Sequence, residues 1–416
     1  MSLALIRENR NYRWLVSASA ISNLGDGVSA LAFPWLASLI TRDPFLISLT
    51  AFAARLPWFL FSLPAGVWTD RLDRRSLMIR ADLFRCVLTL GIVAMVLASP
   101  PPVDNEVLAI GALCAVAFLL GSAEVLRDNA AQTVLPAVVR SEDLERANGQ
   151  MWSIERIMGH FVGPPLAGIL IALALPAPFA FDALTFAVAA ALIWLMVIPA
   201  RIARPRHGFL SELWAGLVWI WRHVMIWRLA IILGCLNACY MASLTMLVLF
   251  SQEILGLGSV GYGLLLTAGA FGGVAGGLLA PSVARAIGGT YSLWLALGLF
   301  ASSYAMIALT ASAWMVGLAL FVEALGAMLW NVVTVSFRQR SIPDELLGRV
   351  NSVYRFFGWG MMPLGALAGG LAVTWLEPEL GREAALRAPY LAGAALVTLL
   401  GVIGTFILRL PASIKK

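Results

Sequence analysis

The stretch Gly66-Val67-Trp68-Thr69-Asp70-Arg71-Leu72-Asp73-Arg74-Arg75 decides how this chain folds, because it places five charged side chains between two long apolar runs. These runs cover approximately residues 45–68 and 76–99. A helix needs about 20 apolar residues to cross the hydrocarbon core of a bilayer. We therefore interpret the stretch as a charged turn that joins two membrane-spanning helices.

The rest of the chain repeats this alternation of apolar run and polar turn. Apolar residues make up 60% of the 416 residues and charged residues 12%, whereas soluble proteins have about 45–50% and 25%. This balance excludes a water-soluble enzyme and a disordered chain. We predict an all-α membrane protein with twelve transmembrane helices, at approximately 12–40, 45–68, 76–99, 106–130, 152–175, 178–199, 229–251, 260–281, 290–311, 313–337, 352–376 and 389–410.

Positive charges indicate which side of the membrane each turn faces. The turns at 100–105, 176–178, 252–259 and 311–313 contain neither arginine nor lysine, while most arginines lie in the tails and the alternate turns. The positive-inside rule then predicts a multi-pass protein of the bacterial inner membrane with both termini in the cytoplasm. The net charge of +6 is orientation charge. We expect no nucleic-acid partner, because no clustered soluble basic face is visible.

The chain also divides into two related halves. The stretch Glu145-Arg146-Ala147-Asn148 is echoed by Gly348-Arg349-Val350-Asn351, each ahead of a span that contains proline. A repeat of six spans predicts a transporter with two pseudo-symmetric six-helix bundles and a binding cavity at their interface. We place the bundles at 1–200 and 229–416. Residues 201–228 form a basic cytoplasmic linker with an amphipathic helix, or alternatively the fraying start of span seven.

Composition excludes several kinds of chemistry. The two lysines, Lys415 and Lys416, lie in the C-terminal tail, so the chain has no Gly-Lys-Ser/Thr phosphate loop. Three histidines and four cysteines show no metal-ligand spacing. A membrane enzyme is the least favoured class, because no arrangement of nucleophile and base is visible. We expect no cofactor and no metal, with a proton gradient as the energy source.

The loop at 66–75 resembles the signature loop of the major facilitator superfamily, which has Gly, three residues, Asp-Arg and then a basic pair. In this interpretation Gly66 lets two helices approach closely, and Asp70 accepts hydrogen bonds from the N-terminus of a facing helix. The resemblance implies an inner gate in which the loop arginines pair with acids such as Asp128; these arginines are Arg71, Arg74 and Arg75. Ordinary positive-inside charge is the alternative.

A second stretch, Gly159-His160-Phe161-Val162-Gly163-Pro164-Pro165-Leu166-Ala167-Gly168, resembles a motif that marks drug-exporting antiporters of the same superfamily. Its candidate residues are Gly159, Gly163, Pro164 and Gly168. The prolines would bend the helix and the glycines would permit close packing against a neighbour; a merely structural kink is the alternative. Residues 23–27 and 80–85 are similar to the macrolide- and tetracycline-efflux-like branch, near which siderophore exporters belong.

A few ionisable residues fall inside the predicted spans. A carboxylate buried in a membrane is costly when charged, so it is paired, water-exposed or protonated. We predict that Asp26 and Glu323 exchange protons during the transport cycle, with Arg55 as the partner of Asp26. Glu124 is a further cavity candidate. The alternatives are a fixed ion pair between Asp26 and Arg55, and a hydrogen-bonded helix contact at Glu323.

The resulting hypothesis is a proton-coupled efflux antiporter that exports amphipathic small molecules or drugs by alternating access. It would work as a monomer among membrane lipids, with protons and the cargo as its partners. Export of an endogenous siderophore or lipid is an alternative within the same class. A membrane sensor that keeps the fold without transport is an alternative from a different class.

Overall fold

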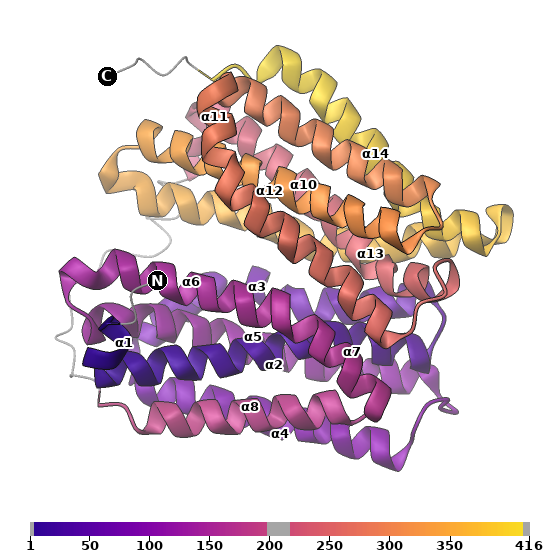
Figure 1. Ribbon diagram of the computed structural model, residues 1–416, viewed down its shortest axis with the longest axis horizontal. Helices are drawn as coiled ribbons and strands as arrows, with labels where there is room; N and C mark the ends of the chain where they lie inside the picture. Colours follow the sequence, from indigo (N-terminus) through magenta and orange to yellow (C-terminus); the bar gives the residue numbers. More distant parts are fainter. Residues whose placement is uncertain (1–3, 198–216, 411–416) are drawn as a thin grey trace. The chain divides into compact units, whose positions relative to one another are not determined.

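The computed structural model describes residues 4–197 and 217–410, except for the side chains at 4, 62–63, 66–67, 70–71, 344–345, 347–349 and 352. All regular secondary structure in these residues is helical (Figure 1). The predicted all-α class is therefore confirmed.

The part of the chain up to residue 197 contains the helices α1 to α8, with a single 3₁₀ turn (η1) and a π-helix (η2) between α5 and α7. The segments α6, η2 and α7 follow one another without a gap, so they form one continuous rod. The bounds are α1 Ala4–Glu8, α2 Arg10–Ile40, α3 Pro44–Arg71, α4 Arg74–Ala98, α5 Glu106–Val138, η1 Ser141–Asp143, α6 Leu144–Glu155, η2 Arg156–Val162, α7 Gly163–Leu173 and α8 Ala177–Trp194.

The part from residue 217 onward contains five long helices, preceded by a short helical segment at 217–222. Gly288 interrupts the longest of them, α11, with φ +81° and ψ 162°, a conformation that side-chain-bearing residues rarely adopt. The predicted spans 260–281 and 290–311 lie on either side of Gly288. The bounds are α10 Val224–Glu253, α11 Ser259–Leu309, α12 Ala313–Ser341, α13 Asp344–Leu380 and α14 Arg382–Ile407.

Short polar residues end one helix and begin the next. The Asp43 carboxylate caps α3 by accepting from the Phe45 N–H at 2.8 Å, and Pro44 occupies the first helical position. The Asp73 carboxylate caps α4 by accepting from the Ser76 N–H at 2.8 Å. These caps satisfy main-chain donors that the helix itself leaves unpaired. They keep the turns short, so consecutive helices lie antiparallel.

Ten helical segments of the described chain are long and apolar enough to cross a membrane. Large apolar side chains also cover outward faces of these helices. On α4, Val87 is 66% exposed and Leu97 is 67% exposed. Such a surface is unfavourable in water and suits contact with lipid. The protein is therefore an integral membrane protein.

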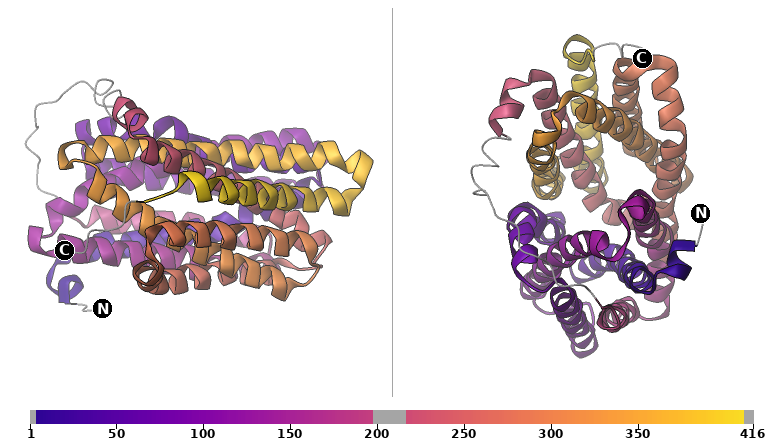
Figure 2. Two further views of the ribbon diagram at one scale, coloured as in Figure 1. Left: turned by 90° about the horizontal axis from the view of Figure 1, so that it is seen from above. Right: turned by 90° about the vertical axis from the view of Figure 1, so that its left-hand side faces the viewer.

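The chain forms two compact units. Unit 1 comprises residues 1–203 and 257–267, and unit 2 comprises 204–256 and 268–416. Within each unit the helices run side by side (Figure 2). In unit 1, α2 and α4 both pack against α8, and α5 packs against α3 and α4. Of the predicted linker 201–228, residues 201–216 lie outside the described residues.

Candidate functional site

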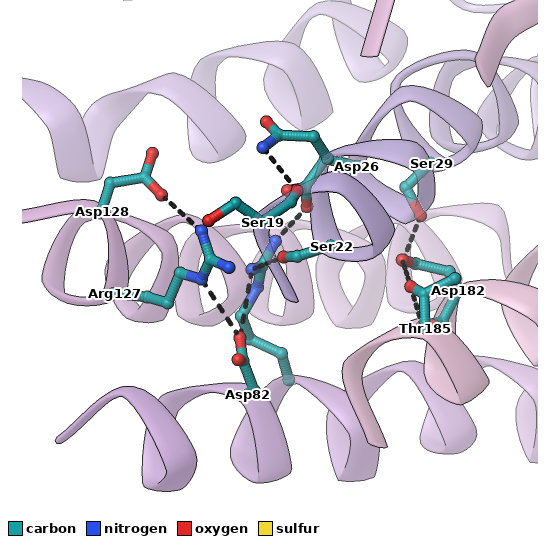
Figure 3. A network of polar contacts seen from close by, with 11 residues as sticks. Ser19, Ser22, Asp26, Ser29, Asp82, Arg127, Asp128, Asp182 and Thr185 are labelled. Carbon is teal, nitrogen blue, oxygen red and sulfur yellow. Dashed lines mark hydrogen bonds and ion pairs between the residues drawn. The ribbon is translucent and has the colours of Figure 1, made fainter. Parts of the chain in front are cut away.

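A chain of alternating acids and arginines runs through unit 1 (Figure 3). Asp26 of α2 pairs with Arg85 of α4. Arg85 Nη2 makes that contact, and Arg85 Nη1 lies 3.8 Å from Asp82 Oδ1. Arg127 Nε of α5 lies 3.6 Å from the same Asp82 oxygen. Arg127 Nη1 continues the chain to Asp128 Oδ1 at 3.4 Å. We call these five residues the charge network; it joins α2, α4 and α5.

The centre of the charge network is sealed and its two ends are accessible. The side chains of Asp82, Arg85 and Arg127 are 0%, 3% and 3% exposed. Those of Asp26 and Asp128 are 31% and 37% exposed. Three carboxyl groups therefore share two guanidinium groups, and the two outer carboxyl groups are partly accessible.

The Arg85 guanidinium is held from several sides. It donates to the Ser22 hydroxyl at 3.5 Å, and its carbon lies 4.0 Å from the centroid of the Phe186 ring of α8. A guanidinium over an aromatic face gains a cation–π attraction. Arg85 therefore connects α2, α4 and α8, and the planar guanidinium group suits both the ion pair and the ring contact.

Further polar side chains surround the accessible end of the network at Asp26. Glu124 of α5 interacts electrostatically with Asp26, Asp128 and Arg55. Glu155, Arg156 and His160, at the junction of α6 and η2, are exposed, and Glu155 interacts with Asp26. Asp26 lies at the middle of α2. Ionisable groups within membrane helices almost always face the interior of the bundle or a water-filled cavity rather than lipid. We call the surface formed by these residues the polar face of unit 1. Its members are Asp26, Arg55, Glu124, Glu155, Arg156 and His160.

The predicted pairing of Asp26 with Arg55 is wrong, because the structure pairs Asp26 with Arg85. Arg55 is exposed on α3. The signal that could have identified Arg85 is its spacing from Asp82, since residues three apart share one face of a helix. In the structure this shared face of α4 points to the interior of unit 1, where both side chains are buried. Glu124 interacts electrostatically with both Asp26 and Arg55, and the role of all three as cavity residues stays a prediction.

Sequence reasoning also missed Asp182, which is 1% exposed near the start of α8. Its carboxylate accepts a hydrogen bond from the Ser29 hydroxyl of α2 and another from the Thr185 hydroxyl at 3.3 Å. Gly25 makes this possible, because a Cβ atom there would collide with Asp182 and Thr185. The sequence signal for this contact of Asp182 with α2 was the four-residue spacing of Gly25 and Ser29, which places both on one face of the helix.

The glycines of the second motif lie where helices touch. A Cβ atom on Gly163 would lie 2.6 Å from the Gly27 Cα, and one on Gly27 would lie 2.8 Å from the Gly159 Cα. The rod formed by α6, η2 and α7 therefore crosses α2 at main-chain contact distance. Gly168 accepts a hydrogen bond on its carbonyl from the Ser259 hydroxyl at 2.9 Å, within unit 1. Pro164 is buried beside Gly163.

The loop at 66–75 has a local structural role within unit 1. Arg74 donates to the Thr133 carbonyl at 2.9 Å, near the end of α5, and Arg75 donates to the Ile193 carbonyl at 3.3 Å, at the end of α8. Cations at helix C-termini are stabilising. Asp128 contacts Arg127. The surroundings of Gly66 and the side chains of Asp70 and Arg71 lie outside what the structure describes, so the place of these residues in an inner gate stays a prediction.

Unit 2 contains a buried carboxyl group of a different kind. Glu323 of α12 is 5% exposed, and its Oε1 atom has no hydrogen-bond partner in the described part of the chain. The Tyr304 hydroxyl of α11 approaches the same carboxyl group. Glu323 borders a cavity of about 10 Å³, which suits one water molecule. The cavity is lined by Tyr240, Ser243, Leu244, Leu247, Ile307, Leu320, Glu323 and Tyr390.

The sequence matches the model of a known protein family. A major facilitator family model, described as "Transmembrane secretion effector", matches residues 2–415. The chain belongs to the major facilitator superfamily. The resemblance predicted from the two motifs is thereby confirmed. Because this superfamily consists of transporters, membership also confirms that the chain is not an enzyme.

Curated relatives of this major facilitator protein are named as efflux pumps. The multidrug efflux pump Tap of Mycobacterium bovis is 28% identical over 249 residues, which are 56% of this chain and 56% of that pump. The chain thus spans about half the length of the relatives it matches first. Tap of Mycolicibacterium fortuitum is 25% identical over 95% of both chains. Macrolide efflux protein A of Streptococcus pyogenes is 23% identical over 85% of this chain and 87% of its own.

Solved structures show the same major facilitator fold at low sequence identity. A mutant form of the nucleoside transporter NupG superposes with a TM-score of 0.75 at 12% identity, over 96% of this chain and 100% of that one. A bacterial homologue of the iron transporter ferroportin superposes with a TM-score of 0.74 at 17% identity, over 97% of this chain and 100% of that one. These likenesses concern the fold alone. Among the residues described here, no cluster of three or more His, Cys, Asp or Glu side chains could hold a metal ion.

Proposed function

We propose that this chain is a proton-coupled antiporter that exports amphipathic small molecules across the inner membrane by alternating access. It does so without a cofactor, as a monomer among lipids, with both termini in the cytoplasm. The efflux pumps among its relatives support the export of drug-like cargo. Twelve spans follow if α2 is counted besides the ten apolar segments and α11 contributes one span on each side of Gly288, with the α6–η2–α7 rod as one. Residues 4–197 and residues 217–410 then contain six each.

The observation that carries the proposal is the position of Asp26. Its carboxyl group is partly accessible and lies at the middle of α2, which we infer to span the membrane. It is paired with the buried Arg85 and belongs to the polar face. When Asp26 takes up a proton, it loses its charge, and its ion pair with Arg85 weakens. Proton binding therefore changes the energy of the contact between α2 and α4. A ligand shifts a conformational equilibrium when it binds one state better than the other.

Glu323 supplies a second proton-binding group, in unit 2. The residues that line its cavity include tyrosines and a serine and no cation. A charged carboxylate in such surroundings is costly unless a cation or hydrogen-bond donors compensate it. Release of its proton then requires water, the cargo or another charge to enter the cavity. Glu323 thus loads and releases a proton only in a state that opens this cavity.

Energised inside-out vesicles test the proposal. Addition of cargo should drive protons out of the acidic lumen, and a pH-sensitive dye records their exit. We expect Asp26→Asn to reduce this proton release at least tenfold, because an amide cannot carry the proton. Glu323→Gln should reduce it in the same way. Collapse of the gradient with a protonophore should abolish cargo accumulation.

Asp104→Asn serves as the matched control, because Asp104 is an exposed carboxylate in the turn between α4 and α5. This variant should behave like the natural chain. Cargo accumulation that survives both Asp26→Asn and loss of the gradient would refute proton coupling at Asp26. A panel of macrolides, other amphipathic drugs, siderophores and lipids in the same vesicles identifies the cargo class.

A further inference from the structure

Asp82, at the centre of the charge network, lacks the contacts that a buried carboxylate normally has. Its side chain is completely buried, and neither oxygen accepts a hydrogen bond from the described residues. Its two ion-pair distances, 3.8 Å to Arg85 and 3.6 Å to Arg127, are longer than a hydrogen bond. Buried polar groups are usually hydrogen-bonded, so this exception requires an explanation.

The donors that could satisfy Asp82 are present but unused. Arg85 Nε, Arg127 Nε and Arg127 Nη2 are buried nitrogens without a hydrogen-bond partner within the described chain. Meanwhile Arg85 makes its short contact with Asp26. Two carboxyl groups on different helices therefore compete for one guanidinium, and the structure has it bound to Asp26.

We propose that Asp82 is the alternative partner of Arg85, and that Arg85 turns from Asp26 to Asp82 when Asp26 takes up a proton. Asp82 is then a positioning residue for coupling: it acts through Arg85 and does not itself carry the transported proton. The inference rests on the proposed function. The switch releases α2 from α4, because Arg85 and Asp82 both lie on α4.

The charged groups around Asp82 and Arg85 come from three neighbouring helices besides their own. Asp82 itself faces Asp26 of α2, Arg127 and Asp128 of α5, and Arg85 of its own helix. Arg85 in turn faces Glu124 of α5 and Asp182 of α8. A negative Asp82 repels a negative Asp26 and competes for Arg85. Both effects favour the protonated form of Asp26. Removing the charge of Asp82 must therefore make Asp26 harder to protonate.

The experiment measures the pH at which cargo-driven proton release is half-maximal, in the vesicles described above. We expect Asp82→Asn to release fewer protons, because Arg85 loses its alternative partner, and to move the midpoint of the remaining release to lower pH by roughly one unit, the usual effect of a charge a few ångströms away. Asp82→Glu should move the midpoint in the opposite direction, because the longer side chain reaches Arg85 more easily. Asp104→Asn should leave it unchanged. A loss of folded protein alone would lower the amplitude without moving the midpoint.

Three results would overturn the inference. One is an unchanged midpoint in both Asp82 variants. A second is a shift of the Asp82→Asn midpoint to higher pH. The third is complete loss of pH dependence in Asp82→Asn while Asp26→Asn keeps it, because Asp82 would then be the proton carrier. If Asp82→Asn does not fold, Asp82→Glu alone decides by the sign of its shift.

A spectroscopic measurement separates this inference from the proposed function. Infrared difference spectra of the purified full chain, with isotope-labelled arginine, report the change of guanidinium bands upon acidification. We expect such a change in the natural chain and its loss in both Asp26→Asn and Asp82→Asn. If vesicles show no proton coupling and this spectral pattern is present, the proposed function fails and the switch stands. If vesicles show coupling and Asp82→Asn keeps the guanidinium change, the switch fails and the proposed function stands.

Discussion

Arg85 and Arg127 each lie within ion-pair distance of Asp82, and all three side chains are buried in the interior of unit 1. A buried ion pair adds little net stability, because removing both charges from water costs about as much as their attraction returns. Breaking such a pair is different, since it leaves one buried charge without compensation. The network is therefore sensitive to the loss of either arginine.

We expect Arg85→Gln to lower the free energy of unfolding by about 3–5 kcal/mol, the usual cost of removing one partner from a buried pair. The substitution leaves Asp26 and Asp82 without their shared cation and removes the contact with Phe186. A fall of several degrees in the apparent Tm of the detergent-solubilised protein measures this effect.

Arg140→Gln is the control, because Arg140 is 83% exposed and lies 3.5 Å from a similarly exposed Glu142. Exposed pairs contribute about 0–1 kcal/mol, so its Tm should hardly change. Equal Tm values for Arg85→Gln and Arg140→Gln would mean that the network does not hold α2 to α4.

The sequence predicts which residue types lie deep in the membrane, but it does not predict their partners. Asp26 and Glu323 were identifiable because a carboxylate inside an apolar run is rare. The partner of Asp26 depends on how α2, α3 and α4 are rotated about their axes. Near-uniform apolar runs contain little information on rotation, because most faces are hydrophobic. For that reason Arg55 was an equally good candidate before Arg85 could be seen beside Asp26.

At the scale of helices, α2 and the α6–η2–α7 rod approach each other through glycines. We expect Gly27→Ala to destabilise the protein by several kcal/mol, because the new Cβ atom would lie 2.8 Å from the Gly159 Cα, where the main chain cannot move aside cheaply. Gly91→Ala is the matched control. Nothing lies within 4 Å of a Cβ atom at Gly91, in the middle of α4, so alanine there should be neutral or stabilising by up to about 1 kcal/mol.

Thermal unfolding of the two alanine variants in one detergent measures the difference. Similar Tm values would show that α2 and the rod can separate at this crossing without cost. A lower Tm for Gly91→Ala than for Gly27→Ala would also contradict the close approach.

Helix positions were more predictable than helix details. The breaks near Asp43, Asp73 and Asn105 follow from capping residues after apolar runs. The π-helix η2 had no such signal, because its wider hydrogen bonding depends on how the rod packs against α2 rather than on composition. The sequence did mark its location through the glycines at 159 and 163.

At the scale of the whole molecule, the topology that we infer can be tested by labelling. In a variant without the four native cysteines, Asp104→Cys should react with a membrane-impermeant maleimide in intact cells. Arg140→Cys should react only after the membrane is opened, because its turn is inferred to be cytoplasmic. Both positions are exposed. Labelling of position 140 from outside would reverse the orientation, since single turns alternate sides along the chain.

The wide segment η2 has a consequence for how such a molecule can move. A π-helix of seven residues holds one residue more than an α-helix of the same length would hold, in the interior of a continuous rod. The wide turn that holds this extra residue can shift along the rod one residue at a time, as hydrogen bonds exchange between neighbouring turns. Each step turns the intervening side chains by about 100°, the rotation per residue of an α-helix. Such a shift rotates Arg156 and His160 about the axis of the rod, while the two ends of the rod stay packed against the neighbouring helices.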